Sequence, residues 1–154
     1  METVFIADDE QVIRDGLKQI IDWESFGFTV CGDAANGEEA LAKILELNPS
    51  LVLIDIRMPK MHGIDVIEAA RAKGFNGKII IISGYSDFKY AQEAIRYGVQ
   101  YYLTKPIDED ELEEILRSIK ENLDKAAATA NTREHYREKA RETCLLYTSD
   151  AADE

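Results

Sequence analysis

The chain has little cysteine and no long apolar run, and both shortages narrow its class. Two cysteines in 154 residues, Cys31 and Cys144, cannot build a disulfide framework, and Cys31 falls in an expected core strand. The aliphatic run Ile79–Ile82 is far too short to span a bilayer. No basic segment leading into an apolar stretch opens the chain. We therefore expect a protein of the reducing cytoplasm, with no membrane segment and no signal peptide.

Basic residues are also scarce. The 18 Lys and Arg face 30 Asp and Glu, which leaves a formal net charge of -12. Proteins that bind the phosphates of nucleic acid carry a basic surface. This sequence contains no cluster of basic residues that would form one. The chain by itself is therefore not expected to bind DNA. With 45% hydrophobic and 31% charged residues it has the composition of a soluble globular domain.

Five short apolar segments alternate with five segments of helical periodicity. The run Leu51–Ile54 is unbroken, as in strands buried on both faces of a parallel sheet. Strands are expected over 3–7, 28–31, 51–54, 78–83 and 101–103, and helices over about 10–23, 37–48, 63–74, 86–98 and 108–123. The economical architecture is an α/β three-layer sandwich around a five-stranded parallel sheet.

Each expected helix has an apolar stripe that predicts its buried face. The stripes are Val12, Ile13, Leu17, Ile20 and Ile21; Leu41, Ile44 and Leu45; Ile64 and Ile67; Phe88, Ala91 and Ile95; and Leu112, Ile115, Leu116, Ile119 and Leu123. Ser86 is expected to cap the fourth helix and Asp108, with Glu111 three residues later, the fifth.

The domain is expected to cover residues 1–123. Residues 124–143 are rich in helix formers and are interpreted as a helical linker or stalk towards a missing output domain. Residues 144–154 show no pattern that continues the helix and are interpreted as a non-native or disordered tail. If the tail is non-native, the natural protein continues beyond about Thr143.

Chemically active side chains lie at the ends of the expected strands. Asp8 and Asp9 follow the first strand, Asp55 the third, Ser83 the fourth and Lys105 the fifth. Parallel strands end at one edge, so these side chains should converge there. Clustered carboxylates repel and need a cation, and oxygen ligands without His or Cys suit Mg²⁺. A hard cation beside a carboxylate and a lysine is suited to phosphoryl transfer.

These motifs resemble the receiver domain of bacterial two-component response regulators. The resemblance covers about residues 2–123 and rests on Asp8–Asp9, Asp55, Arg57-Met58-Pro59 with Gly63, Ser83 and Lys105–Pro106. It implies a flavodoxin-like, doubly wound sheet of strand order 2-1-3-4-5 with five helices.

The resemblance also implies a role for each matching residue. Asp55 would be the phosphoacceptor, and Asp8, Asp9, Asp55 and the main-chain carbonyl of Arg57 would hold Mg²⁺. Lys105 would pair with the phosphoryl oxygens, and its bond to Pro106 would be cis. Ser83 would donate to the phosphoryl group, and Tyr102 would be the aromatic switch that follows it.

Partners are implied in the same way. The phosphoryl donor would be a histidine kinase in the cytoplasm, and the domain would transmit a signal rather than act as an enzyme beyond its own phosphotransfer and dephosphorylation. The segments SGYSDFKYA and WESFGF are most similar to receivers that precede an AraC-type helix-turn-helix domain. DNA would then be bound only through a missing output domain, and homodimers could form through the fourth helix, fifth strand and fifth helix.

Simpler interpretations stay open for single residues. Asp8 or Asp9 can cap the first helix, Ser83 can be an ordinary turn residue, and Tyr102 can be plain packing. A stand-alone, chemotaxis-type receiver is the alternative function. An aspartyl-nucleophile phosphatase is a distant one, because Arg57 occupies the place of its general acid. A flavodoxin-like cofactor binder would need a glycine-rich phosphate loop after the first strand, where this chain has acids.

Overall fold

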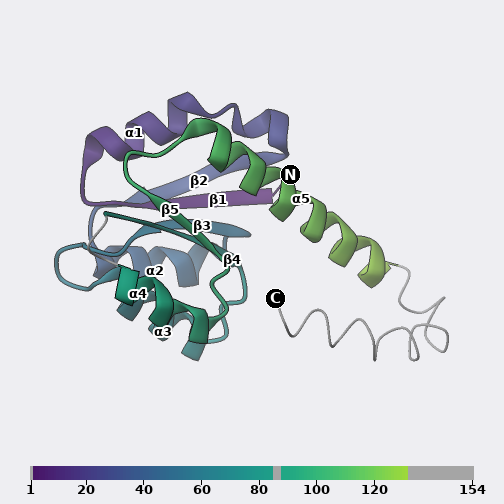
Figure 1. Ribbon diagram of the computed structural model, residues 1–154. Coiled ribbons are helices and arrows are strands. Elements are labelled where there is room, and N and C mark those ends of the chain that lie inside the picture. Colours follow the sequence, from purple (N-terminus) through teal and green to yellow (C-terminus); the bar gives the residue numbers. More distant parts are fainter. Residues whose placement is uncertain (1, 85–87, 132–154) are drawn as a thin grey trace. The chain divides into compact units, whose positions relative to one another are not determined.

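The computed structural model describes residues 2–84 and 88–131 (Figure 1). The chain divides into two compact units, Met1–Leu116 and Arg117–Glu154. The first unit contains the sheet and all the predicted site residues. The division falls inside a helix, within the residues expected to form the receiver, so the predicted boundaries at 123 and 143 stay predictions.

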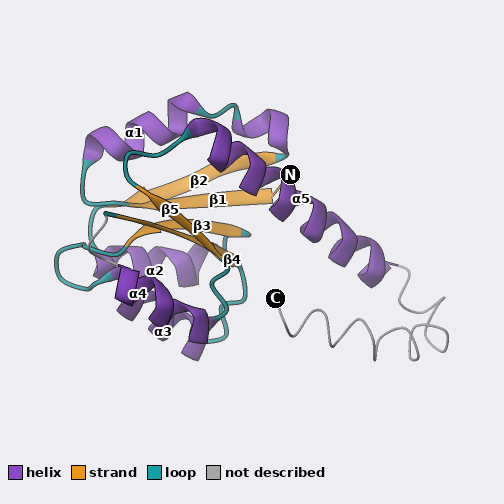
Figure 2. Ribbon diagram, in the orientation of Figure 1, coloured by secondary structure: helices purple, strands orange, loops and turns teal. Residues whose placement is uncertain are grey.

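The first unit is built on one five-stranded sheet. Its strands are β1 (Glu2–Ala7), β2 (Phe28–Ala34), β3 (Leu51–Asp55), β4 (Lys78–Ser83) and β5 (Tyr101–Thr104). All neighbouring pairs are parallel and the order is β2-β1-β3-β4-β5 (Figure 2). The predicted fold class and strand order are therefore confirmed.

Helices cover both faces of this sheet. They are α1 (Gln11–Ile20), α2 (Gly37–Leu47), α3 (Gly63–Ala72), α4 (Phe88–Ala94) and α5 (Glu109–Asn131), with short 3₁₀ turns η1 (Trp23–Phe26) and η3 (Ile95–Tyr97). α1 and the first turns of α5 lie on one face, and α2, α3 and α4 lie on the other (Figure 1). None of these described helices is apolar over a length that could cross a membrane.

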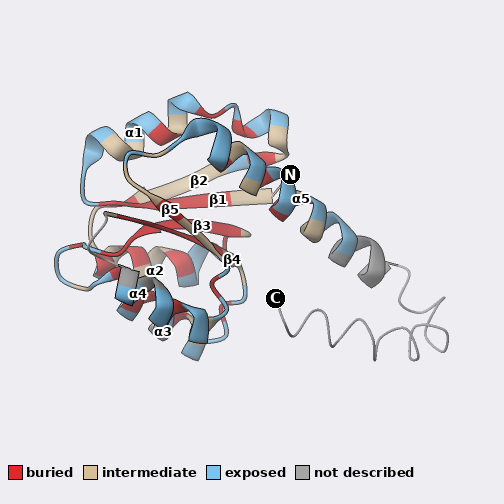
Figure 3. Cartoon of the chain, viewed as in Figure 1, coloured by how far each residue is buried: buried red, intermediate tan, exposed pale blue. Residues whose placement is uncertain are grey.

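The two central strands are buried along their whole length. Every residue of β3 is buried, as is every residue of β4 after Lys78 (Figure 3). Because helices shield both faces, no position on these strands needs a polar side chain. This explains why the runs Leu51–Ile54 and Ile79–Ile82 are unbroken, and it confirms their interpretation as central strands.

The predicted buried face of α1 is partly wrong. Leu17 is buried, but Val12 is 81% exposed and Ile20 is 49% exposed. At 3.6 residues per turn, Val12 stands roughly 140° around the helix from Leu17, so the two cannot share one face. The helix also ends at Ile20 rather than near Trp23, where η1 follows. Ile21 is buried from outside the helix.

The stripes on two other helices also need correction. On α2, Ala40 and Ile44 are buried while Leu45 is 37% exposed, so the buried face follows the line of Gly37, Ala40 and Ile44 and is rotated around the helix from the predicted one. Ile95 is 68% exposed and lies in η3, not in α4. Ser86 and the side chains of Phe88 and Ala91 lie outside what the structure describes.

The predicted buried faces of the third and fifth helices are confirmed for most of the positions in the first unit, although Ile115 is only half-buried. Ile64 and Ile67 are buried on α3, and Leu112 and Leu116 on α5. The Asp108 carboxylate accepts the main-chain N–H groups of Asp110 and Glu111, at 2.9 and 3.4 Å, and so caps α5. The described helix continues to Asn131.

Candidate functional site

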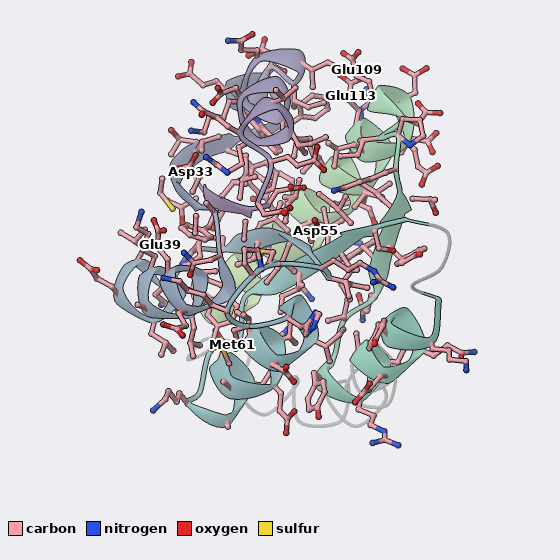
Figure 4. All side chains as sticks on the ribbon, turned by 90° about the vertical axis from the view of Figure 1, so that its left-hand side faces the viewer. Asp33, Glu39, Asp55, Met61, Glu109 and Glu113 are labelled. Atoms are coloured by element: carbon pink, nitrogen blue, oxygen red, sulfur yellow. The ribbon has the colours of Figure 1, made fainter. Side chains whose placement is uncertain are left out.

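Four strands end at one edge of the sheet and bring the predicted residues to it. Asp8 follows β1, Asp55 is the last residue of β3, Ser83 is the last of β4, and Lys105 follows β5. Figure 4 looks onto this edge, with Asp55 labelled near its middle. This is the edge at which open parallel sheets bind ligands.

Lys105 joins the acidic side chains. Its Nζ donates a hydrogen bond to Asp55 Oδ2 at 3.1 Å and lies 3.2 Å from Asp8 Oδ2. Glu10 Oε1 is 3.8 Å from the same ammonium. One half-buried cation therefore faces three carboxylates, which leaves this edge negatively charged.

Burial raises the proton affinity of two of these carboxyl groups, those of Asp8 and Asp55. Asp8 is 0% exposed and Asp55 is 4% exposed. The pKa of Asp55 is raised to about 6, chiefly by loss of water; the charge of Asp8 contributes to the increase, and Lys105 opposes it. Burial also raises the pKa of Asp8. Burial lowers the pKa of Lys105, but the charges of Asp55 and Asp8 outweigh it and the net change is upward.

The acids after β1 fit a hard cation. Carboxylate oxygens of Asp8, Asp9 and Glu10 lie within 4.8 Å of one another. Asp8 Oδ1 accepts the N–H of Glu10 at 2.9 Å, while Asp8 Oδ2 is buried and has no hydrogen-bond partner among the described residues. Lys105 is within ion-pair distance of that oxygen but does not have hydrogen-bond geometry towards it. A buried carboxylate oxygen without a hydrogen bond, in an all-oxygen donor set, suits Mg²⁺.

Ser83 and Tyr102 are joined beside this cluster. Their hydroxyls are hydrogen-bonded at 2.6 Å, with Ser83 fully buried and Tyr102 half-buried against the core. The Lys105 N–H donates to the Ser83 carbonyl at 2.8 Å, and the Lys105–Pro106 peptide bond is cis. Asp55 pairs in register with Ile82, one position before Ser83. The ends of β3, β4 and β5 are therefore linked at this edge.

Comparison with known families identifies the domain. Residues 4–117 match the response regulator receiver domain. The chain belongs to the response regulator receiver family. The resemblance predicted from its motifs is thus confirmed, and receivers are in general signal-transducing domains rather than enzymes.

Similar sequences include transcriptional regulatory proteins from Bacillus subtilis and Staphylococcus aureus. The receiver is 42% identical over 124 residues to the Bacillus subtilis transcriptional regulatory protein YesN, covering 78% of this chain and 34% of that protein. It is 44% identical over 116 residues to the Staphylococcus aureus transcriptional regulatory protein HptR, covering 75% and 45%. The chain therefore spans between a third and a half of the length of these two relatives.

Solved structures show the same fold. The receiver domain of AraT, a response regulator from Geobacillus stearothermophilus, matches with a TM-score of 0.78 and 42% identity, covering 82% of this chain and 98% of that one. A two component transcriptional regulator AraC from Clostridium phytofermentans matches with a TM-score of 0.71 and 34% identity, covering 77% and 92%.

Two residues near the receiver's acidic edge were not predicted as part of the site. Glu10 is one, and Arg14 of α1 is the other. Arg14 donates from Nη1 to the Asp8 carbonyl at 2.7 Å and from Nε to Asp33 Oδ2 at 3.2 Å. Lys18 binds the same Asp33 oxygen at 2.9 Å. The sequence did contain one signal of this contact. Arg14 and Lys18 are four residues apart and so lie on the same side of one helix, and Asp33 is a lone acid in β2.

Proposed function

We propose that Asp55 accepts a phosphoryl group from a histidine kinase and that its phosphorylation switches an output. The observation that carries this proposal is the Lys105 ammonium, which lies 3.1 Å from Asp55 Oδ2 and 3.2 Å from Asp8 Oδ2 in a buried setting. A carboxylate with a fixed ammonium beside it has both the nucleophile and a partner for the incoming phosphoryl oxygens.

The transfer forms one bond and breaks one. An ionised oxygen of Asp55 attacks phosphorus, the P–N bond of the donor phosphohistidine breaks, and the electron pair stays on the imidazole nitrogen. A pKa of about 6 leaves most Asp55 ionised at neutral pH. Lys105 offsets the charge that the phosphoryl oxygens bring into the buried edge. Attack of water on phosphorus later restores the carboxylate and releases phosphate.

Asp8, Asp9, Asp55 and the main-chain carbonyl of Arg57 are the residues that would hold Mg²⁺. When bound, the ion supplies positive charge that neutralises the phosphoryl oxygens. The protein's own contribution is to keep these ligands together. Asp8 is held at the edge by the Glu10 N–H on its side chain and by Arg14 on its main chain. The Arg57 N–H lies 3.4 Å from Asp55 Oδ1.

Ser83 and Tyr102 are proposed as the switch. Turning the Ser83 hydroxyl towards the phosphoryl group would end its bond to Tyr102 and free that ring to change position. The responding surface would be α4, β5 and the first turns of α5, through which homodimers could form.

A DNA-binding output domain belonging to a longer protein would carry the transcriptional response, as the names of YesN and HptR suggest. The exchange with the kinase would take place in the cytoplasm. A stand-alone receiver that acts through protein contacts is the alternative.

The test is intact mass after incubation with a small acyl-phosphate donor, with Mg²⁺ or with EDTA. We expect a single hydroxylamine-labile phosphoryl adduct that needs Mg²⁺ and is absent from Asp55→Asn. Asp65→Asn, at an exposed acid in the first turn of α3, is the matched control and should be modified like the wild type. A folded wild type that binds Mg²⁺ but takes no adduct would overturn the proposal.

A further inference from the structure

The loop after Asp55 contains a strained turn. Lys60 has φ +70, although it is not glycine, and the Met61 N–H donates to the Pro59 carbonyl at 2.8 Å. A hydrogen bond to the residue two positions back, around a central residue with positive φ, makes a γ-turn that L-residues rarely adopt. Such a backbone persists only where its surroundings hold it. The neighbours of Pro59–Met61 should therefore include what imposes the turn.

The start of α2 contacts this turn directly. The Gly37 N–H donates to the Pro59 carbonyl at 3.2 Å, so that oxygen accepts two main-chain hydrogen bonds. Gly37 is the first residue of α2, and the side chain of Asn36 caps the helix by accepting the Glu39 N–H at 2.9 Å. An N–H of the first helical turn has no partner within its own helix, and here the loop carbonyl supplies one.

The contact is close enough to require glycine. A Cβ built on Gly37 would overlap the main-chain oxygen of Met61 and stand 2.5 Å from its Cβ and 2.6 Å from its carbonyl carbon. Two of these atoms are backbone, so a side-chain rotation cannot relieve the overlap. Figure 4 labels Met61, and Glu39 on the neighbouring α2. Any larger residue at position 37 must push α2 and the loop apart.

The other end of the loop is equally confined. Gly63 donates to the Ile56 carbonyl at 2.8 Å, and a Cβ at position 63 would overlap the main-chain carbonyl of Asp55. The segment between Asp55 and Gly63 is thus held at its end by Gly63 and on its α2 side by Gly37. Arg57, whose main-chain carbonyl is a proposed Mg²⁺ ligand, lies within this segment.

We infer that Gly37 is a positioning residue for the phosphoacceptor loop. By holding the Pro59–Met61 turn, it sets where the main chain of Arg57 lies relative to Asp55. The inference rests on the proposed function, because it says that the contact between Gly37 and the Pro59–Met61 turn affects Mg²⁺ binding.

The first test compares Gly37→Ala with two controls. Mg²⁺ affinity is measured by amide chemical-shift titration, and stability by urea unfolding. Gly37→Ala should weaken Mg²⁺ binding by about tenfold, as loss of supporting residues around a metal site does. Gly16→Ala makes the same substitution at an exposed helical position where a Cβ meets nothing within 4 Å. Ile44→Val lowers stability from a buried position of α2. Both controls should keep wild-type Mg²⁺ affinity.

A second pair of variants covers the case in which Gly37→Ala does not fold. Lys60→Gly adopts φ +70 without strain and should keep wild-type Mg²⁺ affinity. Lys60→Pro fixes φ near −65° and cannot form the turn, so its Mg²⁺ affinity should fall by about tenfold.

The inference is overturned if Gly37→Ala folds and binds Mg²⁺ like the wild type. If Gly37→Ala does not fold, the inference is overturned when Lys60→Pro binds Mg²⁺ as tightly as Lys60→Gly does. A wild type that neither binds Mg²⁺ nor takes the phosphoryl adduct overturns the proposed function, and the inference with it. A wild type that does both, beside unaffected variants, overturns the inference alone.

Discussion

Lys105 Nζ lies 3.1 Å from Asp55 Oδ2, although the two residues are fifty positions apart in the sequence. Two buried carboxylates, Asp8 and Asp55, share this one ammonium. The single positive charge of Lys105 therefore balances only part of the negative charge of the two carboxylates. The remaining negative charge should lower the stability of the metal-free fold. Functional sites often cost stability in this way.

Replacing Asp55 should stabilise the metal-free protein at neutral pH. The folded-state pKa of about 6 is above the ordinary 3.8, so the folded chain binds the proton more tightly and stability falls as pH rises between these values. Asp55→Asn removes this loss. In EDTA we expect it to be more stable than wild type by roughly 3 kcal/mol at pH 7.5, with the difference vanishing below about pH 3.

Urea unfolding over a pH series measures this difference. Asp15→Asn, at an exposed position of α1, should follow the wild type throughout. A wild type more stable than Asp55→Asn at pH 7.5 would contradict the expected charge imbalance.

Asp9 should be required for stabilisation by Mg²⁺. At a concentration 100 times its dissociation constant, a ligand that binds only the folded state stabilises it by about 2.7 kcal/mol. Asp9→Asn removes an exposed carboxylate of the acidic cluster and should abolish most of this gain, with little effect in EDTA. Thermal unfolding with and without Mg²⁺ is the measurement, and Asp15→Asn is again the control. Equal Mg²⁺ stabilisation of Asp9→Asn and wild type would exclude Asp9 as a ligand.

Asp33 should stabilise the fold above its pKa. Burial raises the pKa of this carboxyl, but Lys18 and Arg14 outweigh burial and lower it overall. A lowered pKa gives stability that is present above the ordinary value and lost as pH falls through the folded-state value. Because the side chain is 31% exposed, Asp33→Asn should cost only about 1 kcal/mol at pH 7.

The exposed pair Lys43–Glu39 provides the comparison for Asp33. Glu39→Gln should cost less than about 0.5 kcal/mol. Denaturant unfolding at pH 7 and pH 3 separates the cases, and an Asp33→Asn penalty that persists unchanged at pH 3 would show that charge is not its cause.

Tyr102→Phe should test the proposed switch. Losing the 2.6 Å bond to Ser83 should cost about 1 kcal/mol in the unphosphorylated protein. The cost should shrink after phosphorylation, because the proposed role takes the Ser83 hydroxyl to the phosphoryl group. Tyr101→Phe, one position earlier on β5, is the control. Identical costs in both states, measured by unfolding, would leave Tyr102 as a packing residue.

Much of this fold could be predicted from local pattern. Strands buried on both faces need only apolar residues, so the runs of β3 and β4 were recognisable without any knowledge of their neighbours. Polar residues that end such runs must lie at the strand ends, and parallel pairing places those ends at one edge. Asp8, Asp55, Ser83 and Lys105 were therefore predictable as a group.

The particular contacts among side chains depended on the tertiary structure. Which face of α1 meets the sheet decides that Val12 is exposed and that Arg14 reaches the Asp8 carbonyl. The strained turn at Lys60 is not visible in local sequence, because Gly37, whose N–H binds the Pro59 carbonyl, is distant along the chain and adjacent only after folding. Periodicity indicates that a segment has an apolar face, whereas the exact residues that are buried and the partners they contact are set by how separate elements pack.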